Sequence, residues 1–331
     1  MEVWGEITSV ADVIKKLDSA KFKRFRTSVV PDYRAATDYK YPFGIWFRGH
    51  SDAKWRLTPG VFREQGRKVF IEETSMFHHF QLRVSEHRQT YKSTFDWLCL
   101  MQHYDMPTRL LDWTESVLVA LFFAVEDSRR HKTGGRLYVL NARRLNEHTS
   151  DYDRRYRANI CTPTSFDTAA RAQLAISRNL NGWKEGVLSL TKTDTLDIEK
   201  SRKISEQVDS RESKFKEWVA SPVAVFPARL NGRMVLQSSM FTLHGGKVVR
   251  GRERTSPEDL PRPRSLEEIN DHLISKEQFL RAYGVPARCK ESIRTELLTL
   301  GIHPGTLFPE LDKQAAYIKE QWRFELGAGH K

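Results

Sequence analysis

Side chains that can transfer protons, carry charge or stack on rings are concentrated in one string of this sequence, LMQHYDMPTRLLDWTES at positions 100–116. The string contains His103, Arg109, Asp112, Trp113, Thr114 and Glu115. It leads directly into VLVALFFA at positions 117–124, one of the most apolar runs of the chain. A rigid apolar element holds adjoining polar side chains in a fixed geometry, as a functional site requires. We therefore predict that residues 100–116 contribute to such a site.

A second cluster, IWFRGH at positions 45–50, has the same character, because its apolar residues end abruptly in Arg48, Gly49 and His50. A glycine at the end of a strand permits a turn or a close backbone approach to a ligand. We expect the two clusters to form one site.

The elements that position these clusters follow from hydrophobic periodicity and capping. Helices are predicted after the N-cap Ser9, at 68–88, 94–104 and 290–300, and after Pro309. Thr114 is expected to cap a further helix that ends near Asp127, and residues 108–113 are expected to form an exposed connection after Pro107. Strands are predicted at 44–48, 136–140, 222–227, 233–237 and 240–244.

The order of mostly helices, then mostly strands, then helices implies an α+β fold with a mixed or antiparallel sheet core and segregated helices. We divide the chain into an N-terminal helical and basic extension at 1–40, a main domain at 41–320 and a C-terminal tail at 321–331. Within the main domain, residues 146–215 have mixed polarity and weak periodicity, so we interpret them as a polar insertion.

Composition bounds the class of protein. The chain has 331 residues, of which 39% are hydrophobic and 29% charged, as in soluble globular proteins. No stretch approaches the roughly 18 apolar residues of a membrane span, and the N-terminus lacks a secretory pattern, so we expect a cytoplasmic protein without membrane contact. Cys99, Cys161 and Cys289 are widely spaced, which argues against a disulfide framework and a zinc site. Cys99 is expected to be a core residue.

The charge balance is basic, with 54 Lys and Arg against 42 Asp and Glu, a net charge of +12. A sequence pI near 9.6 favours nucleic acid as a partner, although a solvated surface with counterions gives the same balance. The segment 21–26, KFKRFR, interleaves two phenylalanines with four cations. This pattern suits phosphate contact with base stacking, but an amphipathic edge strand has the same pattern, and we favour the edge strand.

Motifs of other enzyme classes are missing from the sequence. It has no GxxxxGK[ST], GxGxxG, HExxH or GxSxG pattern. His78, His79 and His87 lie on a predicted helix without partner cysteines, so we expect no metal site.

Phe47-Arg48-Gly49 and the string Gln102-His-Tyr-x-x-Pro-Thr-Arg-Leu-Leu-Asp-Trp-Thr114 resemble the FRG domain family, which is named after a Phe-Arg-Gly motif. Arg233-x-x-x-Gln237-x-x-x-Phe-Thr242, Val285-Pro-Ala-x-x-Lys290 and the segment 301–311 extend the resemblance over about 41–145 and 219–320. Gln237-Ser-Ser239 departs from it, since Gln-Gln-Gly is expected there. The resemblance implies that the main domain is an FRG domain from a bacterial or phage defence setting, with an antitoxin protein as a candidate partner.

A second resemblance, to ADP-ribosyltransferase folds, rests on the order of Phe47-Arg48-Gly49, the segment 112–116 and Gln237-Ser238. It implies an ADP-ribosyltransferase-like fold and NAD as co-substrate, without a metal. The implied NAD-binding residues are Phe47, Arg48, Gly49, His50, Arg109, Trp113, Thr114 and Gln237. The implied catalytic residues are His103, Asp112 and Glu115, because the transfer passes through an oxocarbenium-like centre that a carboxylate stabilises and needs a proton acceptor.

Several of these residues also have a structural interpretation that the sequence leaves open. Arg48 is suited to a pyrophosphate or the adjacent ribose, and equally to pairing with Asp112. Trp113 is suited to stacking on a nicotinamide or adenine ring, and also to the core. Thr114 is better explained as a helix cap, and His103 as a histidine that bridges two loops.

The sequence therefore favours a toxin-like ADP-ribosyltransferase that modifies nucleic acid, RNA before DNA. Two other classes stay open. One is a basic nucleic-acid-binding module without catalysis, whose binding would weaken steeply with salt. The other is a metal-dependent nuclease that uses the Asp, Glu and His side chains.

Overall fold

The computed structural model describes residues 2–26, 44–63, 71–84, 86, 90–91, 93–126, 132–149, 160–163, 165, 168, 171–172, 217–246 and 262–323. Most of the predicted insertion at 146–215 and the end of the predicted tail lie outside these residues.

The described residues form one seven-stranded sheet with the strand order β1-β7-β4-β2-β3-β6-β5. The strands are β1 (Val3–Glu6), β2 (Ile45–His50), β3 (Leu110–Thr114), β4 (Gly135–Asn141), β5 (Val223–Val225), β6 (Ser239–Leu243) and β7 (Leu280–Val285). β1 is parallel to β7, and the other neighbours are antiparallel. The predicted α+β class with a mixed sheet is confirmed.

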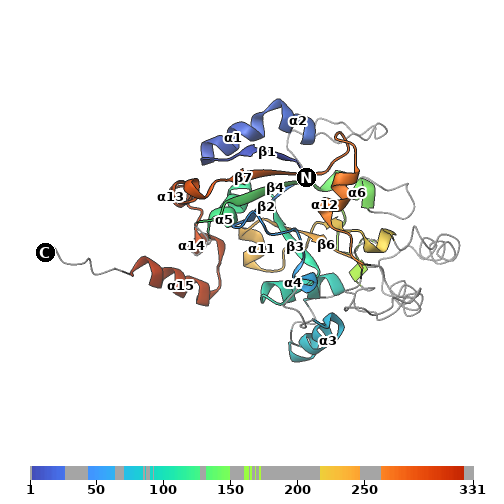
Figure 1. Cartoon of the computed structure of the whole chain (residues 1–331). Coiled ribbons are helices and arrows are strands. Elements are labelled where there is room, and N and C mark those ends of the chain that lie inside the picture. The colour runs from blue at the N-terminus through green and yellow to red at the C-terminus, as the bar shows by residue number, and fades with distance from the viewer. Residues whose placement is uncertain are drawn as a thin grey trace.

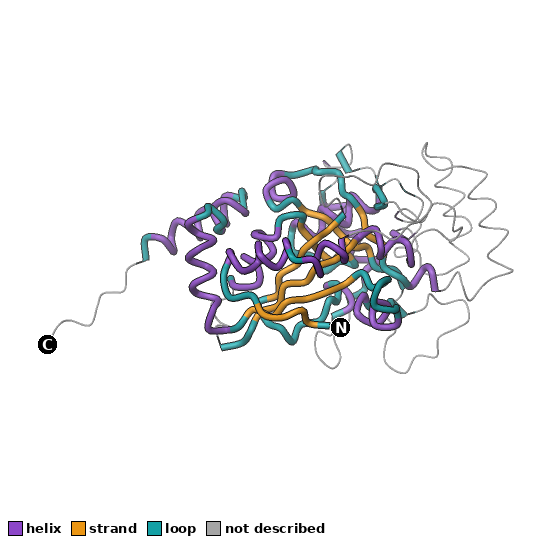
Figure 2. The backbone as a smooth tube through the Cα atoms, turned by 90° about the horizontal axis from the view of Figure 1, so that it is seen from above, coloured by secondary structure: helices purple, strands orange, loops and turns teal. Residues whose placement is uncertain are grey.

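Helices pack on both faces of this sheet (Figure 1). They are α1 (Val10–Asp18), α2 (Ala20–Arg26), α3 (Glu73–Arg83), α4 (Thr94–His103), α5 (Val117–Val125), α6 (Ala142–Thr149), α11 (Gly232–Leu236), α12 (Leu266–His272), α13 (Lys290–Thr299), α14 (Pro304–Leu307) and α15 (Leu311–Gln321). Short 3₁₀ turns lie at Gly60–Phe62 and Ala287–Cys289. Seen from above, the strands run between the helices as a twisted band (Figure 2).

The alternation of side chains along each strand divides the core into layers. On one face, Phe47 of β2 packs with α5 and α13, whereas Leu110 of β3 packs with α4. On the opposite face, Trp46 and Trp113 pack with residues of α6 and α12. The first face therefore carries two apolar clusters that meet where β2 and β3 adjoin.

The sheet opens at this junction. β2 pairs with β4 along its whole length, from Ile45 to His50. With β3 it shares the single pair Phe47 and Thr114. Beyond that pair the two strands diverge, which leaves a gap in the centre of the sheet beside Arg48.

Four predicted elements differ from the structure. Residues 108–113, expected to be an exposed connection, lead into the central strand β3, where pairing with β6 decides the conformation. Residues 21–26 are helical in α2 and not an edge strand, because Phe22 and Phe25 bury one helical face. Residues 233–237 form α11 and not a strand. The cap of α5 is Ser116, whose side chain accepts from the backbone N–H of Val119, and not Thr114.

Residues 2–26 form a strand of the sheet and two helices packed against the core, whereas the sequence suggested an appended extension at 1–40; residues 27–40 of that prediction lie outside the described residues. β1 pairs with β7, and Val13 and Phe22 lie in the same apolar cluster as Phe47. Among the described residues, no helix is both long enough and apolar enough to cross a membrane.

Candidate functional site

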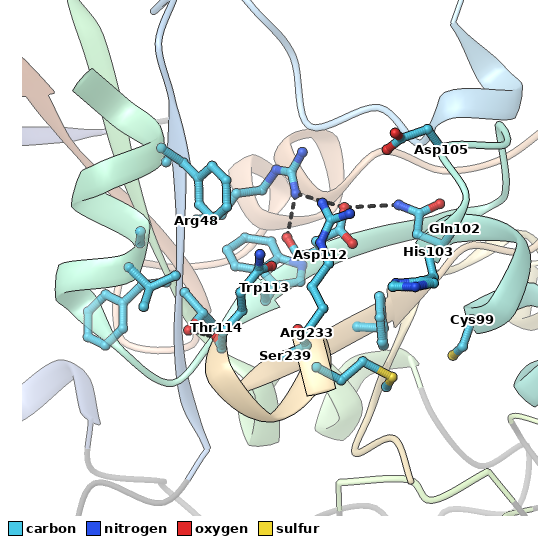
Figure 3. A pocket seen from close by; sticks show the side chains of 18 residues that line it. Arg48, Cys99, Gln102, His103, Asp105, Asp112, Trp113, Thr114, Arg233 and Ser239 are labelled. Atoms are coloured by element: carbon cyan, nitrogen blue, oxygen red, sulfur yellow. Dashed lines mark hydrogen bonds and ion pairs between the residues drawn. The ribbon is translucent and has the colours of Figure 1, made fainter. Parts of the chain in front are cut away.

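A cavity of about 230 Å³ lies at the junction of β2 and β3, between α5 and α4 (Figure 3). Eight of the predicted site residues border it: Phe47, Arg48, Gly49, His103, Asp112, Trp113, Thr114 and Gln237. The two sequence clusters, about 50 residues apart in the chain, therefore both contribute to the lining of one cavity. His50, Arg109 and Glu115 are not among the lining residues.

Arg48 extends into the gap between the two strands. Its Nη1 donates to the backbone carbonyl of Asp112 at 2.5 Å and lies 3.5 Å from Asp112 Oδ2. The guanidinium thus satisfies a carbonyl that the diverging sheet leaves without a ladder partner. Burial lowers the pKa of Arg48, and the Asp112 carboxylate opposes this shift. Arg48 stays protonated, because a guanidinium titrates far above neutral pH.

Asp112 is held by a chain of hydrogen bonds from α4. Thr108 Oγ1 donates to Gln102 Oε1 at 2.5 Å, which orients the amide so that Gln102 Nε2 donates to Asp112 Oδ2 at 2.9 Å. The backbone N–H of Leu110 donates to Thr108 Oγ1 and fixes the start of the chain. Within the described part of the protein, Asp112 Oδ1 accepts no hydrogen bond, and the side chain is 51% exposed. One oxygen of this carboxylate is therefore available to a ligand.

His50 supports Arg48 and does not face the cavity. Its Nε2 accepts a hydrogen bond from Arg48 Nε at 3.0 Å, so the ring proton lies on Nδ1. Burial, together with the neighbouring Arg48 charge, lowers the pKa of His50 to about 2. The imidazole is therefore neutral and fixes the arginine, whereas the resemblance had implied that His50 binds NAD directly.

Gly49 is required by the packing of α5 on the sheet. A Cβ at this position would lie 1.9 Å from the carbonyl oxygen of Ala120 and 2.5 Å from the backbone nitrogen of Ala124. Gly135 on β4 approaches the same helix, with 2.4 Å to the Ala124 oxygen. The predicted close backbone approach is present, but it is an approach to a helix.

His103 borders the cavity from the last turn of α4. Its Nδ1 lies 3.6 Å from Glu310 Oε1, in the residue that precedes α15. Burial lowers the pKa of His103; Glu310 raises it and Arg233 lowers it further. The histidine is therefore mainly neutral near pH 7 and can accept a proton.

Thr114 and Gln237 close the floor of the cavity through hydrogen bonds to the backbone. Thr114 Oγ1 donates to the carbonyl of Gln237 at 2.6 Å and accepts from the N–H of Ser116. Gln237 Nε2 donates to the carbonyl of Leu307 at 3.1 Å. Ser238, next in the chain, has a φ of +47°, so the departure from the expected Gln-Gln-Gly falls at a left-handed residue.

Trp113 borders the cavity, but its indole lies on the opposite face of the sheet. The ring packs with Trp46 and Met240, and Nε1 donates to Thr242 Oγ1 at 3.1 Å. Alternation along β3 separates this ring from Asp112. A stacking role for Trp113 is therefore not supported.

Arg109 and Glu115 have other partners. The Arg109 guanidinium forms a buried fork with both oxygens of Glu73, at 3.0 and 2.5 Å, and also donates to the carbonyl of His244. The N–H groups of Arg109 are therefore occupied by these hydrogen bonds within the core, and the structure does not support the predicted role of Arg109 in cofactor binding. Glu115 Oε2 lies 3.6 Å from Arg229 Nη2, and burial raises its pKa against the effect of that arginine.

Four polar residues at the cavity, Gln102, Asp105, Arg233 and Ser239, were not predicted as site residues. Gln102 stands in the string that carried the prediction, so its motif was the available signal. Arg233 lies in α11, four residues before Gln237, which caps that helix, so both side chains lie on the same side; the strand predicted at 233–237 gave no sign of this. Cys99 also borders the cavity, and burial raises the pKa of its thiol well above the usual range, so it is an inert core residue as expected.

A larger groove of about 670 Å³ adjoins the cavity, and the two share Asp105 and Arg233. Residues of α5, α13, α14 and α15 form its walls, with Phe308 and Tyr317 among the aromatic side chains. The Arg233 guanidinium lies over the Phe308 ring, 4.9 Å from its centre. In the described residues, no group of three or more His, Cys, Asp or Glu side chains is placed to hold a metal ion.

Comparison with known proteins gives one match. Residues 44–133, which span β2, α3, α4, β3 and α5, match the family model of the FRG domain. No curated protein and no solved structure matches the chain.

Proposed function

Since this chain carries an FRG domain, we propose that it is an NAD-dependent ADP-ribosyltransferase with a nucleic acid as acceptor, RNA before DNA. The observation that supports this most is the convergence of Arg48, Asp112 and His103 on one cavity at the opening of the sheet. They supply a cation, a carboxylate with a free oxygen and a neutral imidazole. The proposal includes a cytoplasmic defence or toxin–antitoxin setting with an antitoxin partner.

Two guanidiniums favour an anionic ligand. Arg48 and Arg233 both border the cavity, and in Figure 3 the Arg233 side chain points toward Asp112 and Arg48. Guanidiniums bind phosphate oxygens through forked hydrogen bonds. The pyrophosphate of NAD is such a ligand, and it would compete with Asp112 for Arg48.

The volumes suggest that the two halves of NAD bind in different places, one in the cavity and one in the groove. The cavity of about 230 Å³ is smaller than a typical ligand pocket of roughly 300–1,000 Å³. It suits the nicotinamide riboside half of the dinucleotide. The adenosine half would extend past Arg233 into the groove, where Phe308 and Tyr317 offer aromatic contact.

The residues present can perform the transfer. The bond between the nicotinamide nitrogen and the ribose C1 breaks, and its electron pair neutralises the pyridinium as nicotinamide leaves. The free oxygen of Asp112 stabilises the oxocarbenium-like centre. A nucleophilic atom of the acceptor bonds to C1, and His103 accepts its proton. Glu115 has no part in this step, because it is not at the cavity.

The test is incubation of the purified protein with NAD labelled in the adenylate, together with RNA, single-stranded DNA or duplex DNA. We expect label on RNA with wild-type protein and its loss with Arg48→Ala and Asp112→Asn. Arg288→Ala is the control, because this arginine is 75% exposed and lies outside the cavity. NAD that stays intact in every mixture, with a folded protein, would refute the proposal.

A non-catalytic nucleic-acid-binding function is the second candidate, and α2 favours it. Phe22 and Phe25 are buried, so Lys21, Lys23, Arg24 and Arg26 form an exposed cationic face. Such a face contacts phosphates without base stacking, and the logarithm of its binding constant would fall linearly with the logarithm of salt concentration. Binding that survives Arg48→Ala but is lost with reversed charges on α2 would favour this function.

A further inference from the structure

The outer face of α15 has features that the cavity does not explain. None of its residues is buried, and the helix stands apart from the sheet (Figure 1). Leu311 is 87% exposed, Ile318 53% and Trp322 72%. The backbone N–H of Trp322 donates to the carbonyl of Ile318, so the helical turn continues to that residue.

These side chains follow the spacing of a helix-pairing seam. Leu311, Ala315, Ile318 and Trp322, here called the outer stripe, are separated by four, three and four residues. Apolar residues at this spacing form a narrow seam along one side of a helix and pack into the seam of a second helix. A surface helix normally turns such a seam toward its own core.

The contacts of α15 keep its outer stripe from turning toward the core of its own chain. Gln314 Nε2 donates to the carbonyls of Gly305 and Phe308, at 2.8 and 2.6 Å. The Tyr317 ring stacks on His303, with 5.0 Å between ring centres and 15° between planes. These bonds turn Tyr317 toward the groove and hold the outer stripe, on the opposite side of the helix, toward solvent.

The charges beside the outer stripe favour the α15 helix of a second copy as its partner. Asp312 and Lys319 lie on one flank of the stripe, seven residues apart, and Gln321 lies on the other. In an antiparallel helix pair the same flank of both helices meets, so Asp312 of each copy would face Lys319 of the other. In a parallel pair opposite flanks meet, and this ion pair is lost. Among the described residues, Lys319 has no ion-pair partner, and Asp312 has an exposed pair with Lys313 at 3.9 Å within its own chain.

We propose that the outer stripe of α15 is a self-association surface, which pairs with the outer stripe of a second copy in an antiparallel, two-fold arrangement. The same surface serves both copies, as two-fold symmetry requires. Two helices of three turns bury less than the roughly 1,200 Å² of a stable interface, so the association is reversible. The inference is independent of the proposed enzymatic function.

Sedimentation velocity of the full chain, from low to high micromolar concentration, tests this directly. We expect a monomer–dimer equilibrium, and Ile318→Glu should weaken it about tenfold or more, because a charge replaces a seam residue. Ala316→Glu is the matched control, since it adds the same charge on the groove face of the same helix. A monomer at every concentration, or a dimer that Ile318→Glu leaves unchanged, would overturn the proposal.

Charge exchange tests the orientation. Asp312→Lys and Lys319→Asp should each weaken the dimer, because each places like charges opposite one another across the two-fold axis. The double variant should restore it, because the opposite charges are exchanged but kept. A double variant as weak as the single ones would exclude the antiparallel pairing. Circular dichroism of each variant confirms that the chain remains folded.

Discussion

Substitution of Gly49 by alanine tests whether the glycine of the Phe-Arg-Gly motif serves packing or a ligand. The new Cβ would lie 1.9 Å from the Ala120 oxygen, whereas ordinary contact begins at 3.4 Å. Helix α5 would therefore have to move by about 1.5 Å, against a core that does not deform easily. The obstacle is backbone, so no rotamer change can relieve it.

The expected cost lies at the upper end of overpacking, about 3 kcal/mol or more. Six residues of α5 are buried, and Gly135 holds the same helix from β4, so the displacement disturbs a whole apolar cluster. With a shift of roughly 2–4 °C per kcal/mol for a chain of this class, the melting temperature should fall by about 6–12 °C.

Urea and thermal unfolding of Gly49→Ala should be compared with Gly284→Ala. Gly284 lies on β7 of the same sheet, where a Cβ would have only Glu6 Cγ at 3.9 Å and the Gly5 oxygen at 4.0 Å. That variant should be neutral or stabilised by up to about 1 kcal/mol. Equal stability of the two variants would refute the packing argument. A stable Gly49→Ala that fails to bind NAD would instead restore the ligand interpretation.

Three further predictions concern ionisable side chains in the core and at the cavity. Glu73→Ala should lower the free energy of unfolding by about 3–5 kcal/mol, because it leaves the Arg109 guanidinium buried without its carboxylate; an unchanged urea midpoint would contradict this. Burial lowers the pKa of His244 to about 3, below its unfolded value, so the unfolded state takes up the proton and this contribution to stability is lost as pH falls below about 6.5. The loss should approach 1.4 kcal/mol per pH unit, and the free energy of unfolding of His244→Gln, measured in urea, should depend on pH less steeply by that amount; equal slopes would refute the assignment. Glu310→Gln should lower the pKa of His103 in an NMR titration, because the carboxylate that raises it is removed, and an unchanged pKa would show that the 3.6 Å pair carries no interaction.

Much of the secondary structure followed from local patterns, because local forces decide it. Ser9 caps α1 through the N–H of Asp12, as predicted, and the spacing within 290–300 gave α13. The central strand β3 was not predicted, because its five residues follow Pro107 and include the charged Asp112. Its conformation depends on strands β2 and β6, which are distant in sequence.

The candidate site, too, was predicted only in part from the sequence. The sequence alone located its components, since Arg48, His103 and Asp112 were selected from residue type and the apolar runs beside them. Side-chain direction decided the roles that local patterns left open. The Trp113 ring lies on the opposite face of the sheet, and the Arg109 guanidinium is paired with Glu73 in the core.

What the sequence by itself determined is the set of reactive side chains and the class of fold, because residue chemistry and periodicity are local properties. Only the tertiary structure decided which of those side chains face one cavity. The gap that holds Arg48 exists because β2 and β3 share a single residue pair. Contacts from distant segments, such as Glu310 beside His103, depend on chain paths that close loops of some two hundred residues, and no local pattern encodes them.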